Sequence, residues 1–179
     1  FAGVNGSGKH NNWSVVTDTG INLFKPGSDP INNLPFLATM ACLVKGIDEY
    51  ADLLRLSVAT AGNDYRLGAN EAPPAIISMV LGSEVNRVFD SIVNDREMEE
   101  VHKQRFNTGV AVVSDFSKDD SDRNRTSPFA FTGNKFEFRT VGSSDSIASA
   151  NITLNTIVAE AFCEAADILE QAEDFEMAV

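Results

Sequence analysis

Residues 129–141, with the sequence FAFTGNKFEFRTV, decide the fold. Apolar and other residues alternate across Phe129–Phe131 and again across Lys135–Val141, which is the period-two pattern of β-strands. Gly133-Asn134 between the two runs is a turn signal. The sequence therefore predicts a β-hairpin in this region.

The second strand of this hairpin has two chemically different faces. Residues two apart share a face of a strand, so Lys135, Glu137 and Arg139 are expected on one face. Phe136 and Phe138 are expected to be buried on the other face. From the residues alone, the charged face is either a solvated surface or the wall of an active site.

Helical patterns surround the hairpin in the sequence. Pro35 suits the first turn of a helix that runs to about Ile47, and a second helical pattern covers about 48–59. A third covers about 84–93, with Ser83 as its expected cap. The fourth is amphipathic over 152–171, and its expected apolar stripe includes Ile157, Ala161 and Ile168.

Shorter patterns complete an α+β fold class. Trp13–Thr17 alternates weakly and predicts a short strand. Gly62-Asn63-Asp64 is expected to end the second helix, and Ala75–Leu81 is either a strand or a buried helix. Residues 107–125 contain an apolar patch and then a charged run, which indicates an exposed linker. Strands and helices do not alternate regularly, which is typical of α+β proteins.

Composition limits the classes of function. The 179 residues suffice for one domain, and their net charge of −12 argues against general binding to nucleic acid or anionic membranes. No apolar run is long enough for a transmembrane helix. Cys42 and Cys163 lie in apolar helical patterns and are expected as buried thiols. The chain begins at Phe1 inside a glycine-rich motif, which suggests a piece of a longer protein.

The glycine-rich motif at residues 3–10, GVNGSGKH, has three interpretations. It approaches a phosphate-binding P-loop, but His10 stands where Ser or Thr should hold Mg²⁺, and residues 11–16 are a poor helix start. It could also be a turn without chemistry. The pattern favours a third interpretation, in which the glycines allow close backbone approach to a ligand and His10 binds a metal.

Two further motifs are ambiguous when taken alone. Residues 122–128, DRNRTSP, contain closely spaced arginines that suit phosphate oxygens but could equally pair with the preceding acidic run. Residues 62–74, GNDYRLGANEAPP, suggest either a binding loop or an ordinary turn between helices.

The order of these motifs resembles the glutamine synthetase family. Residues 5–14 are similar to its NGxGxHxxxS pattern, and residues 66–73 are similar to its arginine-to-EAP loop. Residues 124–127 resemble its NRxS segment, and residues 137–139 resemble its ExR strand. The longer strings around these motifs are similar to the type III class specifically.

The resemblance implies an ATP-dependent ligase that joins ammonia to the γ-carboxylate of L-glutamate through γ-glutamyl phosphate, giving glutamine, ADP and phosphate. Mg²⁺ or Mn²⁺, together with arginines, would offset the repulsion between the anionic reactants. The implied architecture is an antiparallel β-sheet that forms the active-site wall, with flanking helices. Residues 1–179 would form a single partial catalytic domain, without the upstream metal-ligand strands or the N-terminal domain.

The resemblance also implies roles for individual residues. It implies His10 and Glu137 as metal ligands. Implied contacts to glutamate are made by Asn5, Gly6, Arg66 and Arg139. Implied nucleotide and phosphate contacts are made by Ser14, Arg125 and Lys135. Glu71 would close the site and accept a proton from ammonium, and with Arg125 and Arg139 it makes up the implied catalytic set.

Three positions depart from the more familiar classes of the family. Ala130 replaces a second arginine, and Asn12 stands where some classes have a nucleotide-stacking histidine. The spacing from Arg66 to Glu71 is one residue shorter, which affects the assignment of Arg66.

The implied partners are glutamate, ammonium and ATP, in a homo-oligomer built as a dodecamer of hexameric rings, with cytoplasm as the default compartment and no nucleic acid or membrane. Because the family needs further acidic ligands and a loop from a neighbouring subunit, the 179 residues alone are expected to be inactive.

Three alternatives remain. Another glutamine-synthetase-like γ-glutamyl ligase would share the phosphorylation step. A P-loop nucleotide-binding module would require a helix starting near Lys9, and a strand through Trp13–Val16 would reject it. A non-catalytic structural relative, of the kind found in lens, would have lost catalytic positions.

Overall fold

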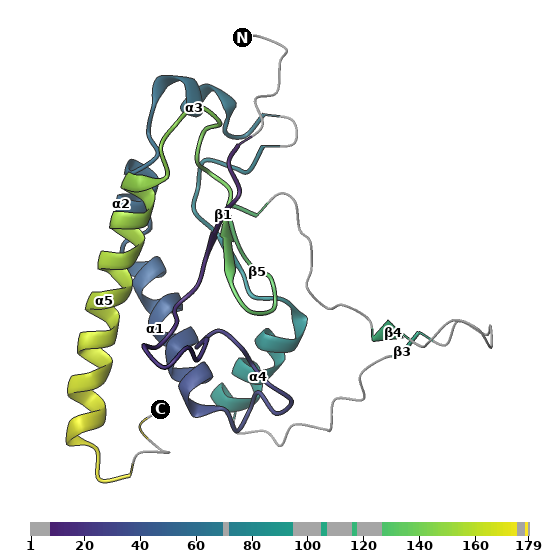
Figure 1. Cartoon of the computed structure of the whole chain (residues 1–179), viewed down its shortest axis with the longest axis vertical. Helices are drawn as coiled ribbons and strands as arrows, with labels where there is room; N and C mark the ends of the chain where they lie inside the picture. The colour runs from purple at the N-terminus through teal and green to yellow at the C-terminus, as the bar shows by residue number, and fades with distance from the viewer. Residues whose placement is uncertain are drawn as a thin grey trace.

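The computed structural model describes residues 8–69, 72–94, 105–106, 116–117, 127–174 and 178. Within these ranges the chain is α+β, as expected, with a small sheet beside a pair of long helices (Figure 1). The sheet has four strands in the order β1-β6-β5-β2. Their bounds are β1 Asn11–Trp13, β2 Met79–Val80, β5 Phe129–Phe131 and β6 Phe136–Phe138.

The expected hairpin forms the centre of the sheet. Strands β5 and β6 pair antiparallel, and β1 adds to the other edge of β6, also antiparallel. Gly133 in the turn has a φ of 92°, a conformation that glycine adopts without strain. The expectation of a wholly antiparallel sheet was wrong, because β2 pairs parallel to β5. The sheet is therefore mixed.

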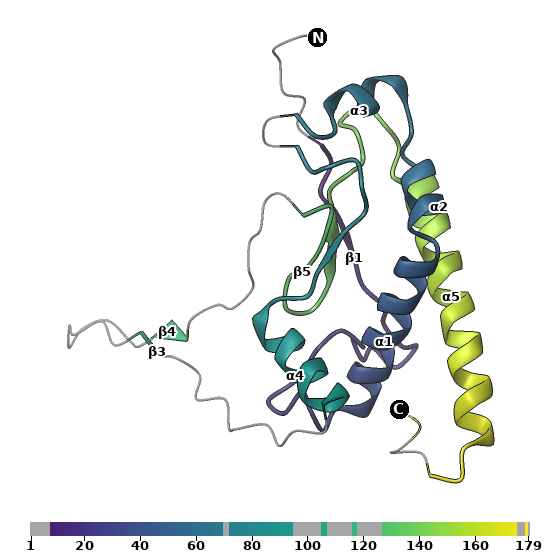
Figure 2. The same ribbon diagram turned by 180° about the vertical axis from the view of Figure 1, so that it is seen from behind.

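Helices α1 (Leu34–Glu49) and α5 (Ala148–Gln171) lie side by side in both views (Figures 1 and 2). The side chain of Asn33 caps α1, and Pro35 lies in its first turn as predicted. A Cβ at Gly46 would lie only 2.8 Å from Ile157 Cγ2 of α5. The absence of a side chain at Gly46 therefore allows the two helices to approach closely.

Three shorter helices complete the fold: α2 (Ala51–Leu56), α3 (Ala61–Arg66) and α4 (Ser83–Val93). Helix α3 was not predicted, because Gly62-Asn63-Asp64 was interpreted as the end of the preceding helix. The side chain of Thr60 accepts a hydrogen bond from the backbone N–H of Asn63 and so begins a new helix. A separate antiparallel pair joins β3 (Arg105–Phe106) to β4 (Phe116–Ser117).

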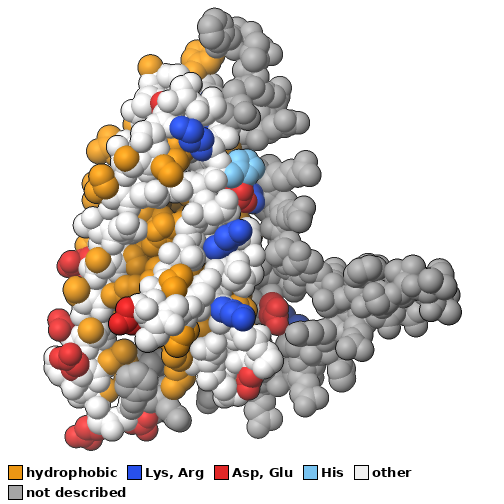
Figure 3. Space-filling view, viewed as in Figure 1, with side chains coloured by type: hydrophobic (Ala, Val, Ile, Leu, Met, Phe, Trp, Pro, Cys, Tyr) orange, Lys and Arg blue, Asp and Glu red, His pale blue; other side chains and the backbone are white. Residues whose placement is uncertain are grey.

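The core lies between the aromatic face of the sheet and the helices. It contains phenylalanines from the strands and apolar side chains from α1 and α5, among them Phe36, Met40, Leu43, Phe129, Phe136, Phe138, Leu154 and Ile157. Figure 3 shows further hydrophobic side chains at the surface over the helices. Among the described residues, no helix is both long and apolar enough to cross a membrane.

Several local predictions were wrong in detail. Strand β1 begins earlier than the predicted Trp13–Thr17 strand. Gly82, rather than Ser83, occupies the cap position of α4, with a φ of 87°. Ile168 was placed on the buried stripe of α5 but is 61% exposed. Cys42 is buried as expected, whereas Cys163 is exposed, and both are free thiols.

Candidate functional site

The candidate site lies on the face of the sheet opposite the phenylalanines. Asn12 of β1 pairs with Glu137 of β6, and Glu137 in turn pairs with Ala130 of β5. Directly paired residues of neighbouring strands point to the same side, so these three residues share a face. His10 lies two residues before Asn12, so it also faces this side.

Glu137 is the centre of a three-residue contact. His10 Nδ1 lies 2.5 Å from Glu137 Oε1. Arg139 donates from Nε and Nη2 to Glu137 Oε2, at 3.0 and 2.7 Å. Each carboxylate oxygen therefore has its own partner, and two charge-assisted hydrogen bonds from the arginine converge on Oε2.

Exposure of the side chains increases from one end of this contact to the other. Arg139 is 8% exposed and Glu137 is 15% exposed, whereas His10 is 65% exposed. In the space-filling view, a histidine lies at the surface beside an acidic and a basic side chain (Figure 3). The imidazole is thus accessible from solvent, while the arginine is fixed beneath it.

Opposing effects set the pKa of Glu137. Burial raises this pKa, but the hydrogen bonds and charge of Arg139, together with those of His10, outweigh burial and hold it below its ordinary value. Glu137 is therefore a carboxylate at neutral pH, which is the form that binds a metal ion.

The donor set suits part of a divalent metal site. An imidazole nitrogen and a carboxylate oxygen that meet at one point are ligands for Mn²⁺ and similar ions, and carboxylate oxygen is preferred by Mg²⁺. Within the described ranges, no group of three or more His, Cys, Asp or Glu residues could hold a metal. His10 and Glu137 therefore fit as two ligands of a larger set.

Arg66 approaches the same region from helix α3. Its Nε donates to Asn63 Oδ1 at 3.1 Å. Its Nη2 donates to the backbone carbonyl of Arg139, which is the first of several consecutive carbonyls that it faces. Burial lowers the pKa of Arg66, while the charge of Asp145 acts in the opposite direction. The guanidinium is thus in contact with the backbone of the strand end that carries Arg139.

The other predicted site residues are either peripheral or lie outside the described residues. Ser14 is exposed just after β1, and Lys135 is exposed in the turn before β6. The described ranges do not include Asn5, Gly6, Glu71 and Arg125. The roles predicted for all of these residues stay predictions.

Sequence reasoning missed the residues that support this region from below. Asn63 and Thr140 are almost fully buried. Lys9 donates from Nζ to the carbonyl of Asp145. One local signal was available, because Thr60 stands three residues before Asn63, which is the spacing of a helix cap. The contacts with Thr140 and Asp145 cross more than seventy residues and leave no local pattern.

The P-loop alternative is contradicted by this geometry. Lys9 is followed by strand β1 at Asn11–Trp13, and from residue 8, where the described part of the chain begins, the first helix is α1 at Leu34. A P-loop must lead directly into a helix whose N-terminus faces the phosphates. The Gly8-Lys9-His10 segment instead leads the chain into the sheet.

The fold and site define an α+β protein whose sheet presents a histidine, a carboxylate and an arginine together. Comparison with known proteins narrows this class. The chain is 55% identical over 160 residues to a type-3 glutamine synthetase of Dictyostelium discoideum, which covers 89% of the chain and 22% of that protein. It is 50% identical over 162 residues to a glutamine synthetase of Bacteroides fragilis, with the same two coverages.

A glutamine synthetase of Butyrivibrio fibrisolvens is 56% identical over 137 residues, which is 76% of the chain and 19% of that protein. No protein-family model matches the chain. The predicted resemblance to glutamine synthetase, including the type III class, is therefore confirmed. The chain spans about a fifth of the length of the curated relatives that it matches.

Proposed function

We propose that the sheet face of His10, Glu137 and Arg139 is part of the active site of a glutamine synthetase. The observation that carries this proposal is the contact of His10 Nδ1 with Glu137 at 2.5 Å, with Arg139 on the second carboxylate oxygen. Two motifs that are far apart in the sequence, residues 5–14 and residues 137–139, thereby contribute side chains to one cluster. The similarity to proteins named glutamine synthetase supports the same function.

In this proposal the reaction is the ATP-dependent ligation of ammonia to the γ-carboxylate of L-glutamate, through γ-glutamyl phosphate. His10 and Glu137 would hold a divalent cation, Mg²⁺ or Mn²⁺, which would supply positive charge to the phosphate groups. Arg139 holds Glu137 in orientation and would present its guanidinium to the γ-carboxylate. Because Arg139 is buried and already fixed, little reorganisation would be needed when substrate binds.

The remaining roles follow the resemblance. Asn5, Gly6 and Arg66 would contact the rest of glutamate. Arg125, Lys135 and Ser14 would lie on the nucleotide and phosphate side. Glu71 would accept a proton from ammonium as ammonia forms. The proposed assembly is a homo-oligomer, the dodecamer of hexameric rings that the resemblance implies, in the cytoplasm.

The proposal is tested by Glu137→Gln in the full-length protein that contains this chain. The amide keeps the shape of the carboxylate but loses its charge. We expect Mn²⁺ affinity to fall by about tenfold or more, measured by titration calorimetry, and glutamine formation to fall by about a hundredfold. Glu49→Gln is the matched control, because Glu49 is an exposed glutamate on α1 that pairs with Lys45.

If Glu137→Gln and Glu49→Gln bind Mn²⁺ and form glutamine equally well, Glu137 is not a metal ligand and the proposal fails. The isolated 179-residue chain offers a second measurement. We expect it to form no glutamine, since two ligands are too few for a stable Mg²⁺ site. Glutamine production by this chain alone would show that it already holds a complete active site.

A further inference from the structure

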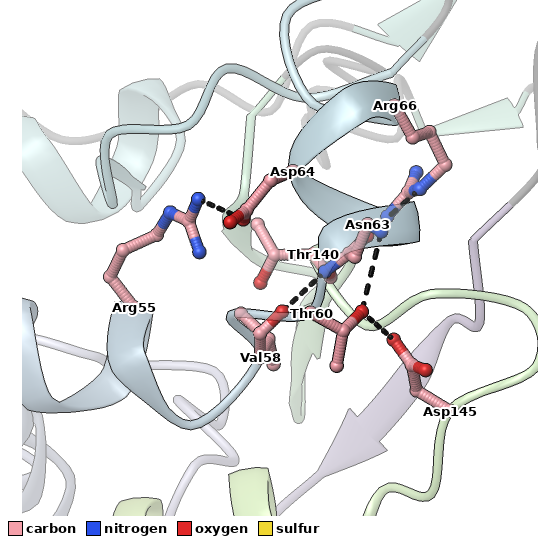
Figure 4. Close-up of polar contacts among 8 residues, drawn as sticks. All are labelled: Arg55, Val58, Thr60, Asn63, Asp64, Arg66, Thr140 and Asp145. Atoms are coloured by element: carbon pink, nitrogen blue, oxygen red, sulfur yellow. Dashed lines mark hydrogen bonds and ion pairs between the residues drawn. The ribbon is translucent and has the colours of Figure 1, made fainter.

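A compact set of hydrogen bonds joins helix α3 to the backbone that follows strand β6 (Figure 4). Asn63 lies at its centre and is only 3% exposed. Its Nδ2 donates to the carbonyls of Val58 and Thr140, at 2.8 and 2.7 Å. Its Oδ1 accepts a hydrogen bond from Arg66 Nε at 3.1 Å. Both donors and the acceptor of this buried amide are therefore in use.

The guanidinium of Arg66 extends the contact along the same backbone. Its Nη2 lies 3.4, 3.2 and 3.4 Å from three successive carbonyl oxygens, those of Arg139, Thr140 and Val141. Asn63 fixes the other side of this guanidinium through Nε. The orientation of Arg66 over the strand end therefore depends on the side chain of Asn63.

Two glycines make room for this arrangement. A Cβ at Gly8 would lie 2.9 Å from both Arg66 Nη atoms and from the carbonyl oxygen of Val141. A Cβ at Gly142 would lie 2.5 Å from Asp145 Oδ2. Gly8 and Gly142 also form an antiparallel bridge with each other. Only glycine permits such close approach of backbone and side chains at both positions.

The same contacts connect the two halves of the candidate site. The backbone N–H of Lys9 donates to the carbonyl of Val141 at 2.9 Å. Lys9 is the neighbour of His10, and Val141 lies two residues beyond Arg139. Asn63 thus holds the backbone at Thr140, beside Val141, and the segment that carries His10 is hydrogen-bonded to that same backbone.

We propose that Asn63 is a positioning residue of the glutamine synthetase site, which orients Arg66 and holds the Arg139–Val141 backbone against Lys9–His10. It touches none of the reacting groups and acts through the residues that it holds. This inference rests on the proposed function for its kinetic consequence, whereas its structural consequence can be measured independently.

Asn33 provides a matched control. Its Oδ1 accepts from the N–H of Phe36 at 3.2 Å, and its Nδ2 donates to the carbonyls of Lys25 and Pro26, at 3.2 and 3.1 Å. Asn33 thus also donates to two backbone carbonyls and accepts one hydrogen bond, in its case from a backbone N–H. The start of α1, which Asn33 caps, lies at the opposite end of the fold from α3 (Figures 1 and 2).

The experiment compares Asn63→Ala with Asn33→Ala in the full-length protein. Both variants are expected to lower the unfolding temperature, because each loses three hydrogen bonds. Only Asn63→Ala should raise the KM for glutamate, by about tenfold or more, as loss of support behind a binding group does. Only Asn63→Ala should speed amide hydrogen exchange in peptides that contain Lys9, by a similar factor.

Asn63→Asp serves if the alanine variant does not fold. It is isosteric and keeps an acceptor for Arg66, but it loses both donors, so exchange at Lys9 should still rise. Equal exchange at Lys9 in the Asn63 and Asn33 variants would overturn the positioning role, whatever the protein catalyses. Faster exchange with no glutamine formed by the wild type would retain the positioning role and reject the proposed function instead.

Discussion

The two faces of strand β6 differ in what they do for the molecule. Phe136 and Phe138 on one face are fully buried, and Phe136 stacks on Phe129 with ring centroids 4.8 Å apart. Glu137, between them in the sequence, faces the other way and contacts His10 and Arg139. One strand therefore supplies stability from one face and a candidate site from the other, so substitutions on the two faces should have separable effects.

The largest effect on stability is expected from Phe136→Ala. Removing a fully buried aromatic ring that contacts three other phenylalanines should lower the free energy of unfolding by about 3–5 kcal/mol. Urea unfolding would measure this loss. Any loss of activity should then be proportional to the unfolded fraction. A Phe136→Ala protein that is stable but inactive would contradict this separation, because it would give the phenylalanine face of β6 a functional role.

Glu137→Gln should have an intermediate effect, of about 1.5–3 kcal/mol at neutral pH, because it weakens hydrogen bonds to a charged group. The effect should depend on pH. The pKa of Glu137 is lower in the folded protein than its ordinary value of 4.5. Its ionised form therefore stabilises the fold above about pH 4.5, and this contribution is lost as pH falls through the lower folded pKa.

Unfolding curves of the wild type and Glu137→Gln at several pH values would measure this dependence. The difference in unfolding free energy should be constant near neutral pH and shrink in acid. A difference that grows below pH 4.5 would mean that the pKa of Glu137 is raised rather than lowered.

The smallest effect on stability is expected from His10→Ala. The imidazole is 65% exposed, and exposed ion pairs contribute about 0–1 kcal/mol. The unfolding free energy should therefore change by less than about 1 kcal/mol, while Mn²⁺ binding by the full-length protein should weaken by about tenfold or more. A destabilised variant with unchanged Mn²⁺ affinity would make His10 a structural residue.

The parts of the fold that could be predicted from the sequence are those that depend on local signals. The hairpin could be predicted because alternation and a Gly-Asn turn are local signals, and the pairing of β5 with β6 confirms it. Helix α1 could be predicted because Pro35 and the apolar spacing are also local signals, and the structure confirms it. The parallel pairing of β2 with β5 was missed, because it joins Met79 to Phe129 and no local pattern records such a partner.

The candidate site likewise has a part that could be predicted from the sequence and a part that could not. Motif order led to His10, Glu137 and Arg139 as a group, and the structure brings their side chains together, while their chemical roles stay predictions. Asn63 was interpreted only as part of a turn. Its importance depends on Thr140 and Arg66, which surround it only after the chain has folded. A buried amide with distant partners has no periodicity to detect.

Trp13 gives this molecule a built-in optical reporter. It is the single tryptophan of the chain, and its indole N–H donates to Asn155 Oδ1 of α5 at 2.8 Å. Its ring lies 5.6 Å from that of Phe24, in the core. Because Trp13 is three residues from His10 on the same short segment, its fluorescence reports whether the segment that carries the candidate metal ligand is docked on α5. Folding of the segment that carries His10 can therefore be followed by intrinsic tryptophan fluorescence, without an added label.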